Sequence, residues 1–188
     1  MAEAEDRDAL ARLRLARSEG VGPATFRRLI ERHGSARAAL AALPRLAAAS
    51  GRPIAACPED AALREAEALA RLGGRFVHFG DPDYPPLLAL IEDAPPVLAV
   101  VGDATILKRP QVGVVGARSA SAAGRRMAEE LAAGLTTGGI VVTSGLARGV
   151  DAAAHLGALA AHGRTIAVVA GGLDEPYPAE NAALQARI

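Results

Sequence analysis

The first 73 residues carry apolar side chains at helical spacing. Leu10 and Leu13 belong to an amphipathic pattern that ends at a Gly-Val-Gly-Pro turn over residues 20–23. No run in this stretch alternates as a half-buried strand would. The expected helices begin at about Asp8, cover residues 25–33 with Gly34 as the C-terminal glycine, form a short segment capped by Ser35, and cover Pro58–Leu72. The pattern predicts a small all-helical domain over residues 1–73.

After Gly74 the chain changes to short apolar runs bounded by Gly or Pro. Residues 75–79 predict a strand and residues 97–101 form another apolar run, with a proline-rich stretch between them. Three strand–helix units follow, with strands over 112–115, 140–143 and 165–170 and helices over 122–137, 150–162 and from about 179. Continuous apolar strands that alternate with helices predict a parallel sheet covered on both faces. With right-handed crossovers, residues 74–188 are expected to form a doubly wound α/β domain.

Composition narrows the classes of protein but not the ligand. The 188 residues are 51% hydrophobic and carry 21 basic and 21 acidic side chains, which excludes a basic-tail nucleic-acid binder and an acidic buffer protein. A local basic pocket stays compatible with zero net charge. Cys57 is the single cysteine, so no internal disulfide and no cysteine-based metal site is expected. The charged N-terminus and the lack of an apolar run of about 20 residues favour a cytoplasmic protein without a membrane span.

Three glycine-rich loops follow the strands of the predicted α/β domain. They cover residues 116–121, 144–149 and 171–174, and two of them carry one arginine each, Arg118 and Arg148. Ligands of open parallel sheets bind at this edge, where glycine admits a close backbone approach, helix N-termini favour anions and arginine matches phosphate. The loops therefore predict a phosphate-bearing ligand. The alternative, that the glycines only make tight turns and the arginines are solvated, has equal weight at this point.

Two known nucleotide motifs do not fit. Arg118 stands where the second glycine of a dinucleotide-binding fingerprint is required, and no Walker A pattern occurs. We therefore expect no nucleotide cofactor. No spacing of metal-ligand residues is found either.

Two further patterns have a functional and a structural interpretation. Asp151 and His155 share a helix face, which suits acid–base chemistry, but a carboxylate near a helix N-terminus has a structural reason to be there, and we favour that interpretation. No nucleophile accompanies the pair, so no catalytic residues are predicted. The turn at Gly20–Gly22 is similar to a helix-hairpin-helix, which contacts DNA phosphates, although a plain helical turn is the favoured interpretation. The other histidines, His33, His78 and His162, are expected at the surface or in turns.

Taken together, these motifs resemble one bacterial family. Val-Gly-Ala-Arg-Ser-Ala-Ser (115–121), Ser-Gly-Leu-Ala-Arg-Gly-Val-Asp-Ala-Ala-Ala-His (144–155), and Gly-Gly-Leu-Asp followed by Tyr-Pro-Ala-Glu-Asn (171–181) resemble the DNA-processing protein A family, DprA or Smf. The resemblance implies a sterile-alpha-motif-like (SAM-like) helical domain followed by a Rossmann-like domain. It also implies a non-enzymatic protein that binds and protects incoming single-stranded DNA in natural transformation, helps load RecA and forms a homodimer at full length. The residues implied to contact nucleic acid are Gly116, Arg118, Ser144, Gly145, Arg148, Gly149 and Gly172.

The chain departs from the family pattern in two places. A further basic position after the Tyr-Pro motif is occupied by Ala182 and Ala183, and the family's Rossmann-like domain continues past Ile188. We therefore expect the α/β domain to be incomplete at its C-terminal end, which puts the dimer and the RecA contacts in question. With three Phe, two Tyr and no Trp, binding is expected to depend on phosphates rather than on base stacking.

Two other functions remain as alternatives. The first is a nucleotide-binding enzyme of the lysine-decarboxylase-like class that cleaves nucleoside monophosphates, although its Pro-Gly-Gly-Xaa-Gly-Thr loop is missing from this sequence. The second is a duplex-DNA module that acts through the turn at Gly20–Gly22.

Overall fold

The computed structural model describes residues 2–50 and 54–188 and divides into two compact units, Met1–Val101 (unit 1) and Gly102–Ile188 (unit 2). The predicted domain boundary at residues 73 and 74 lies before this division, because the strands that follow it pack against the helices of unit 1. No helix among the described residues is both long and apolar enough to cross a membrane.

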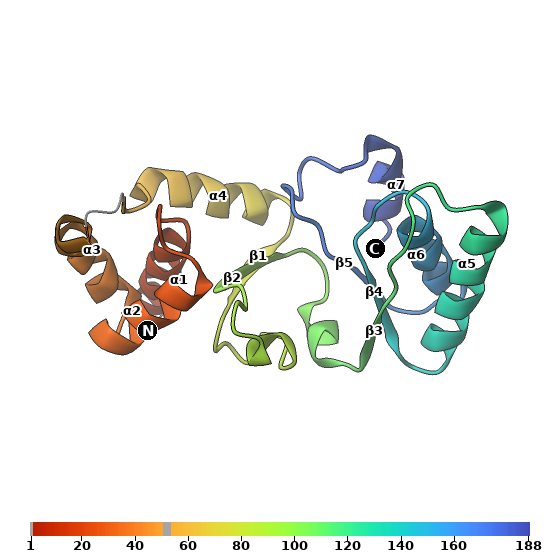
Figure 1. Ribbon diagram of the computed structural model, residues 1–188, viewed down its shortest axis with the longest axis horizontal. Helices are drawn as coiled ribbons and strands as arrows, with labels where there is room; N and C mark the ends of the chain where they lie inside the picture. The colour runs from red at the N-terminus through yellow and green to blue at the C-terminus, as the bar shows by residue number, and fades with distance from the viewer. Residues whose placement is uncertain (1, 51–53) are drawn as a thin grey trace. The chain divides into compact units, whose positions relative to one another are not determined.

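Unit 1 begins with four helices, drawn from red to yellow in Figure 1. They are α1 (Ala2–Ala16), α2 (Pro23–His33), α3 (Ala36–Ser50) and α4 (Glu59–Arg71). The amide of Gly34, at φ 76°, donates to the Ile30 carbonyl oxygen over 2.7 Å, and Ser35 Oγ accepts from the Ala38 amide over 3.2 Å. Both predicted helix signals are thereby confirmed, since each depends only on neighbouring residues.

The extents of α1 and α3 differ from the sequence prediction. Helix α1 begins at Ala2, ahead of the apolar pattern, in a segment of Ala, Glu and Asp. Helix α3 is not short: it continues through Pro44 to Ser50 in a run rich in alanine, the strongest helix former. Helix propensity extends both elements beyond the region that hydrophobic spacing marks.

A two-stranded antiparallel sheet completes unit 1. It pairs β1 (Arg75–His78) with β2 (Val97–Val100), so that Arg75 faces Val100 and His78 faces Val97. The proline-rich stretch between the strands contains a short 3-10 turn, η1 (Leu88–Leu90), and the Tyr84 hydroxyl donates to the Pro95 carbonyl oxygen over 2.7 Å.

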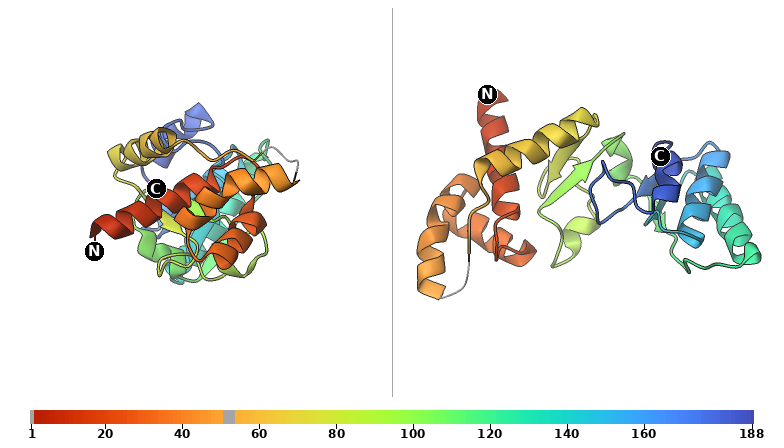
Figure 2. Two further views of the ribbon diagram at one scale, coloured as in Figure 1. Left: turned by 90° about the vertical axis from the view of Figure 1, so that its left-hand side faces the viewer. Right: turned by 90° about the horizontal axis from the view of Figure 1, so that it is seen from above.

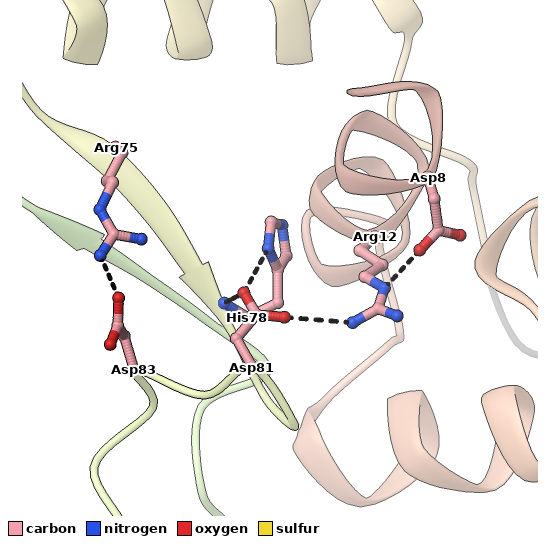
Figure 3. Close-up of polar contacts among 6 residues, drawn as sticks. All are labelled: Asp8, Arg12, Arg75, His78, Asp81 and Asp83. Carbon is pink, nitrogen blue, oxygen red and sulfur yellow. Dashed lines mark hydrogen bonds and ion pairs between the residues drawn. The ribbon is translucent and has the colours of Figure 1, made fainter. Parts of the chain in front are cut away.

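The buried His78 links this sheet to the following loop. It is buried rather than at the surface, which corrects the sequence prediction, and Asp81 accepts hydrogen bonds from the His78 amide over 2.8 Å and faces its Nδ1 at 3.3 Å. Burial lowers the pKa of His78, and the Asp81 carboxylate opposes this effect. Arg12 of α1 lies 3.7 Å from the other Asp81 oxygen and 2.7 Å from Asp8 (Figure 3). The aspartate therefore joins the β1 loop to the first helix.

Unit 2 has a three-stranded parallel sheet in the order β3 (Gln111–Gly113), β4 (Val141–Ser144) and β5 (Thr165–Ala167). The connecting helices are α5 (Ala122–Thr137) and α6 (Val150–Ala160). The predicted α/β fold with a parallel sheet is confirmed. Three short elements complete the unit: η2 (Ala104–Lys108), η3 (Ala179–Asn181) and α7 (Ala182–Gln185).

Helices α5 and α6 pack against each other on one side of this sheet (Figures 1 and 2). Since the spatial order of the strands is their order in the chain, right-handed crossovers place both helices on the same face. The two crossover helices of the described residues therefore do not cover both faces of the sheet, as the apolar strands had led us to expect. The helix contact is close: a Cβ on Gly157 would lie 2.2 Å from the Glu129 carbonyl oxygen. Because the three strands are parallel, their carboxyl ends lie at one edge of the sheet, where the loops that follow them come together.

Candidate functional site

A pocket of about 360 Å³ lies in unit 2, among the loops that follow the parallel strands. Four of the predicted site residues line it: Arg118, Gly145, Arg148 and Gly172. The rest of its wall includes residues 168–172 after β5 and the Tyr177–Pro178 segment. The loops at the carboxyl edge of the sheet therefore line a common cavity, as expected for this fold class.

The two arginines of the pocket differ in their contacts. Arg148 is exposed and lies 2.9 Å from the carboxylate of Glu180, which is also exposed. Arg118 is exposed as well, and its side chain forms no ion pair or hydrogen bond with the described residues. One guanidinium is thus available to an anion directly, and the other after it exchanges its carboxylate partner.

Gly116 and Gly149 hold the two arginine-bearing loops close together without lining the pocket. A Cβ on Gly149, which has φ 79°, would lie 2.2 Å from the Ala117 carbonyl oxygen and 2.6 Å from that of Arg118. A Cβ on Gly116 would lie 2.7 Å from the Val150 side chain. The first turn of α6 therefore packs directly on the backbone of the Arg118 loop, which brings both guanidiniums to one cavity.

One backbone amide and one hydroxyl among the predicted site residues already have partners. The Gly145 amide donates to Asp151 Oδ2 over 3.1 Å, and Ser144 Oγ donates to the Val114 carbonyl oxygen over 2.7 Å. Ser144 is buried and does not line the pocket. The Gly145 amide and the Ser144 hydroxyl are therefore not free for an anion, whereas the two arginine side chains of the pocket can contact one.

The sequence did not identify two residues that shape the pocket. Asn181 Nδ2 donates to the Leu146 carbonyl oxygen over 2.8 Å, and Leu146 has the unusual φ of 57°. Tyr177 lines the pocket with its ring exposed. Both residues belong to the Tyr-Pro-Ala-Glu-Asn motif, but the motif gives no sign of a partner 35 residues earlier or of an exposed ring.

His155 and Asp151 do not form an acid–base pair. Thr165 Oγ1 donates to the Val142 carbonyl oxygen over 2.8 Å, so it accepts from His155 Nδ1 at 2.7 Å. Burial lowers the pKa of His155 to about 4, with Asp151 opposing the shift. The histidine is a neutral core residue and the aspartate fixes the Gly145 loop, which agrees with the structural interpretation. Among the described residues, no three His, Cys, Asp or Glu gather as metal ligands.

Fold and site define the class of protein: a helical domain coupled to a parallel α/β unit with an arginine-lined pocket at the edge of its sheet. Residues 75–188 match the family model of DNA recombination-mediator protein A, and residues 6–68 match that of the DprA-like N-terminal HHH domain. The chain belongs to the DprA family.

Known relatives and solved structures agree with this assignment. DNA processing protein DprA of Streptococcus pneumoniae (strain ATCC BAA-255 / R6) is 46% identical over 105 residues, covering 56% of this chain and 37% of that protein. Protein Smf of Escherichia coli (strain K12) is 41% identical over 105 residues, covering 56% and 28%. The chain therefore spans less than half the length of these curated relatives.

Solved structures resemble the chain as well. The X-ray structure of DprA from S. pneumoniae has a TM-score of 0.62 and 38% identity, covering 69% of this chain and 44% of that chain. A structure described as giving insights into the single-stranded DNA binding mode of DprA from Helicobacter pylori has a TM-score of 0.52 and 29% identity, covering 60% and 51%.

Proposed function

We propose that unit 2 binds single-stranded DNA, with backbone phosphates held by Arg118 and Arg148. The observation that carries this proposal is that both guanidiniums line one pocket at the carboxyl edge of the sheet. The H. pylori relative, whose title names a single-stranded DNA binding mode, supports the choice of ligand. Gly145 and Gly172 would form the nearby backbone wall, and Gly116, Ser144 and Gly149 would hold the loops in place.

Attraction between arginine and phosphate should supply most of the binding free energy. Arginine donates two parallel hydrogen bonds to a phosphate, and such charge-assisted bonds are stronger than neutral ones. If about two to four phosphates are neutralised, the log–log salt slope of the association constant is roughly −1.5 to −3. Binding should therefore weaken steeply with salt although the whole chain carries no net charge.

The test compares arginines inside and outside the pocket. Arg148→Ala and Arg118→Ala should each weaken binding of a fluorescent oligothymidylate by about 5- to 50-fold in anisotropy titrations and make the salt slope shallower by about 0.7. The matched control is Arg126→Ala on α5, because Arg126 is also exposed and ion-paired, at 2.8 Å from Glu130, but does not line the pocket. Unchanged affinity in both folded pocket variants would rule out this pocket as the DNA site.

At full length we propose the wider role that the family resemblance implies: a cytoplasmic, non-enzymatic homodimer that protects incoming DNA and helps load RecA during transformation. Two measurements check this role, the nuclease sensitivity of bound oligonucleotide and the rate at which RecA filaments nucleate on it. Turnover of a nucleoside monophosphate by the purified chain would instead favour the lysine-decarboxylase-like alternative.

A further inference from the structure

We propose that Tyr177 is a nucleobase platform in the same pocket, on which one unpaired base of the bound strand stacks. This inference rests on the proposed function and adds a contact of a different chemical kind. Tyr177 is 76% exposed and lines the pocket together with Arg118 and Arg148. Its hydroxyl and its ring have no hydrogen bond or ring contact with the described residues.

The other aromatic rings of the chain have structural roles. Tyr84 is 5% exposed, its hydroxyl bonds the Pro95 carbonyl oxygen, and its ring meets Phe79 edge to face at 5.4 Å. Phe26 is buried in the helical core, and Phe76 and Phe79 are half-buried. The chain has five aromatic residues, all of them described, and Tyr177 alone is exposed. The expectation of binding without stacking followed from how few aromatics there are, and the position of this one changes it.

The backbone around Tyr177 is held in place. Prolines stand on both sides of the residue, and proline restricts φ. The Asn181 amide donates to the Pro178 carbonyl oxygen over 2.9 Å, while the Asn181 side chain donates to the Leu146 carbonyl oxygen. The ring is therefore presented from an anchored segment, and a tyrosine side chain loses little conformational entropy when a ligand covers it.

The surroundings of the ring suit one nucleotide. Val168, which is 61% exposed, and Val169 give the pocket an apolar wall, and the two guanidiniums supply the charge that a phosphate needs. The volume of about 360 Å³ lies within the range of roughly 300–1,000 Å³ typical of small-ligand pockets. A base on Tyr177 with its neighbouring phosphate on an arginine uses both kinds of surface.

This arrangement gives a physical basis for choosing single strands over duplex. Arginine contacts to phosphate are available to either form of DNA. A ring face is available only to a base that is not already stacked and paired, and every base has such a face. Tyr177 should therefore favour single strands while reading little sequence.

The experiment separates base from phosphate. We compare oligothymidylate with an abasic strand that has the same number of phosphates, using the whole chain and its Tyr177→Ala and Tyr177→Phe variants, each checked for folding by circular dichroism. The wild type should bind oligothymidylate about tenfold more tightly than the abasic strand, within the range of about 5- to 150-fold that stacking of one base supplies. Tyr177→Ala should lose this preference and keep its affinity for the abasic strand, whereas Tyr177→Phe should retain the preference.

Tyrosine fluorescence supplies a second readout, since the chain has no tryptophan. Oligothymidylate should quench the emission of the wild type, and this quenching should disappear in Tyr177→Phe although binding does not, because Tyr84 is buried in unit 1.

The possible outcomes distinguish the two proposals. Equal binding of both strands by the wild type, with weaker binding of both by Arg118→Ala, would overturn the base platform and leave the phosphate pocket standing. An equal loss for both strands in Tyr177→Ala would also overturn it, because the ring would then act on the shape of the pocket. If neither strand binds the wild type, both the proposed function and this inference are overturned.

Discussion

The two units build their interiors from the same alanine-rich sequence in different ways. Unit 1 fills the space between its helices with large side chains, among them the fully buried Leu15 and Leu43. In unit 2, the cluster between the sheet and its helices consists of Ala132, Val142, Ala154 and Ala158, and α5 and α6 approach until backbone meets backbone at Gly157. The helices of unit 1 are held apart by large side chains, whereas the contact between α5 and α6 depends on the absence of a side chain at Gly157.

The units also use their arginines differently. In unit 1, Arg14 of α1 and Arg17, directly after that helix, pair with Glu59 and Glu65 of α4, both at 2.8 Å. In unit 2, the pocket arginines connect no helices of the core: Arg118 has no ionic partner among the described residues, and Arg148 has an exposed one. Arginines that pair with carboxylates of a neighbouring helix in unit 1 thus contrast with arginines that are open to a ligand in unit 2.

Removing volume should damage unit 1 most. Leu15→Ala leaves a cavity at a fully buried position and should cost about 2–5 kcal/mol of unfolding free energy. Urea denaturation followed by tyrosine fluorescence in a Tyr177→Phe background, where Tyr84 of unit 1 is the remaining tyrosine, measures the loss. Leu90→Ala is the control, since Leu90 is 79% exposed and its truncation should stay within about 0.5 kcal/mol. Comparable losses in both variants would mean that unit 1 is not stabilised by large buried side chains.

Adding a single methyl group between α5 and α6 should destabilise unit 2. Gly157→Ala places a methyl group 2.2 Å from the Glu129 carbonyl oxygen, so α5 and α6 must move apart, at a cost of about 1–3 kcal/mol. The same change at Gly134 of α5 meets nothing within 4 Å, and there alanine should stabilise the helix by up to about 1 kcal/mol. Thermal unfolding of both variants measures the difference. A Gly157→Ala variant as stable as Gly134→Ala would contradict the close backbone packing.

The sequence predicts contacts between residues that are close along the chain, but not contacts between residues that are far apart in the sequence. The Gly34 helix end and the Ser35 cap, whose Oγ accepts from the Ala38 amide over 3.2 Å, are local contacts, and both were predicted. The burial of His78 and the packing of β1 and β2 with the helices depend on partners far along the chain, which no periodicity reveals.

The candidate site shows the same division. The position of the arginine loops follows from the topology of a parallel sheet, so four predicted residues come together in one pocket. That Gly149 serves contact between the loops, and that Glu180 faces Arg148, required the folded backbone. The role of each predicted residue toward DNA stays a prediction.

The smallest expected effect concerns the carboxylate beside Arg148. In the free protein Glu180 lies where a phosphate would approach, 2.9 Å from the guanidinium, so the ligand must displace one exposed ion pair and meets a negative charge. Glu180→Gln should tighten binding of oligothymidylate by about two- to fivefold at low salt, as the weak energy of an exposed pair implies, and the gain should shrink as salt rises. Glu130→Gln is the matched control: it changes the net charge equally and releases Arg126 on α5, at 2.8 Å, away from the pocket. An equal gain in both variants would assign the effect to net charge alone. Weaker binding in Glu180→Gln would mean that the carboxylate positions Arg148 for its phosphate. Arg148 would then resemble Arg14 and Arg17 of unit 1, each of which is paired with a carboxylate.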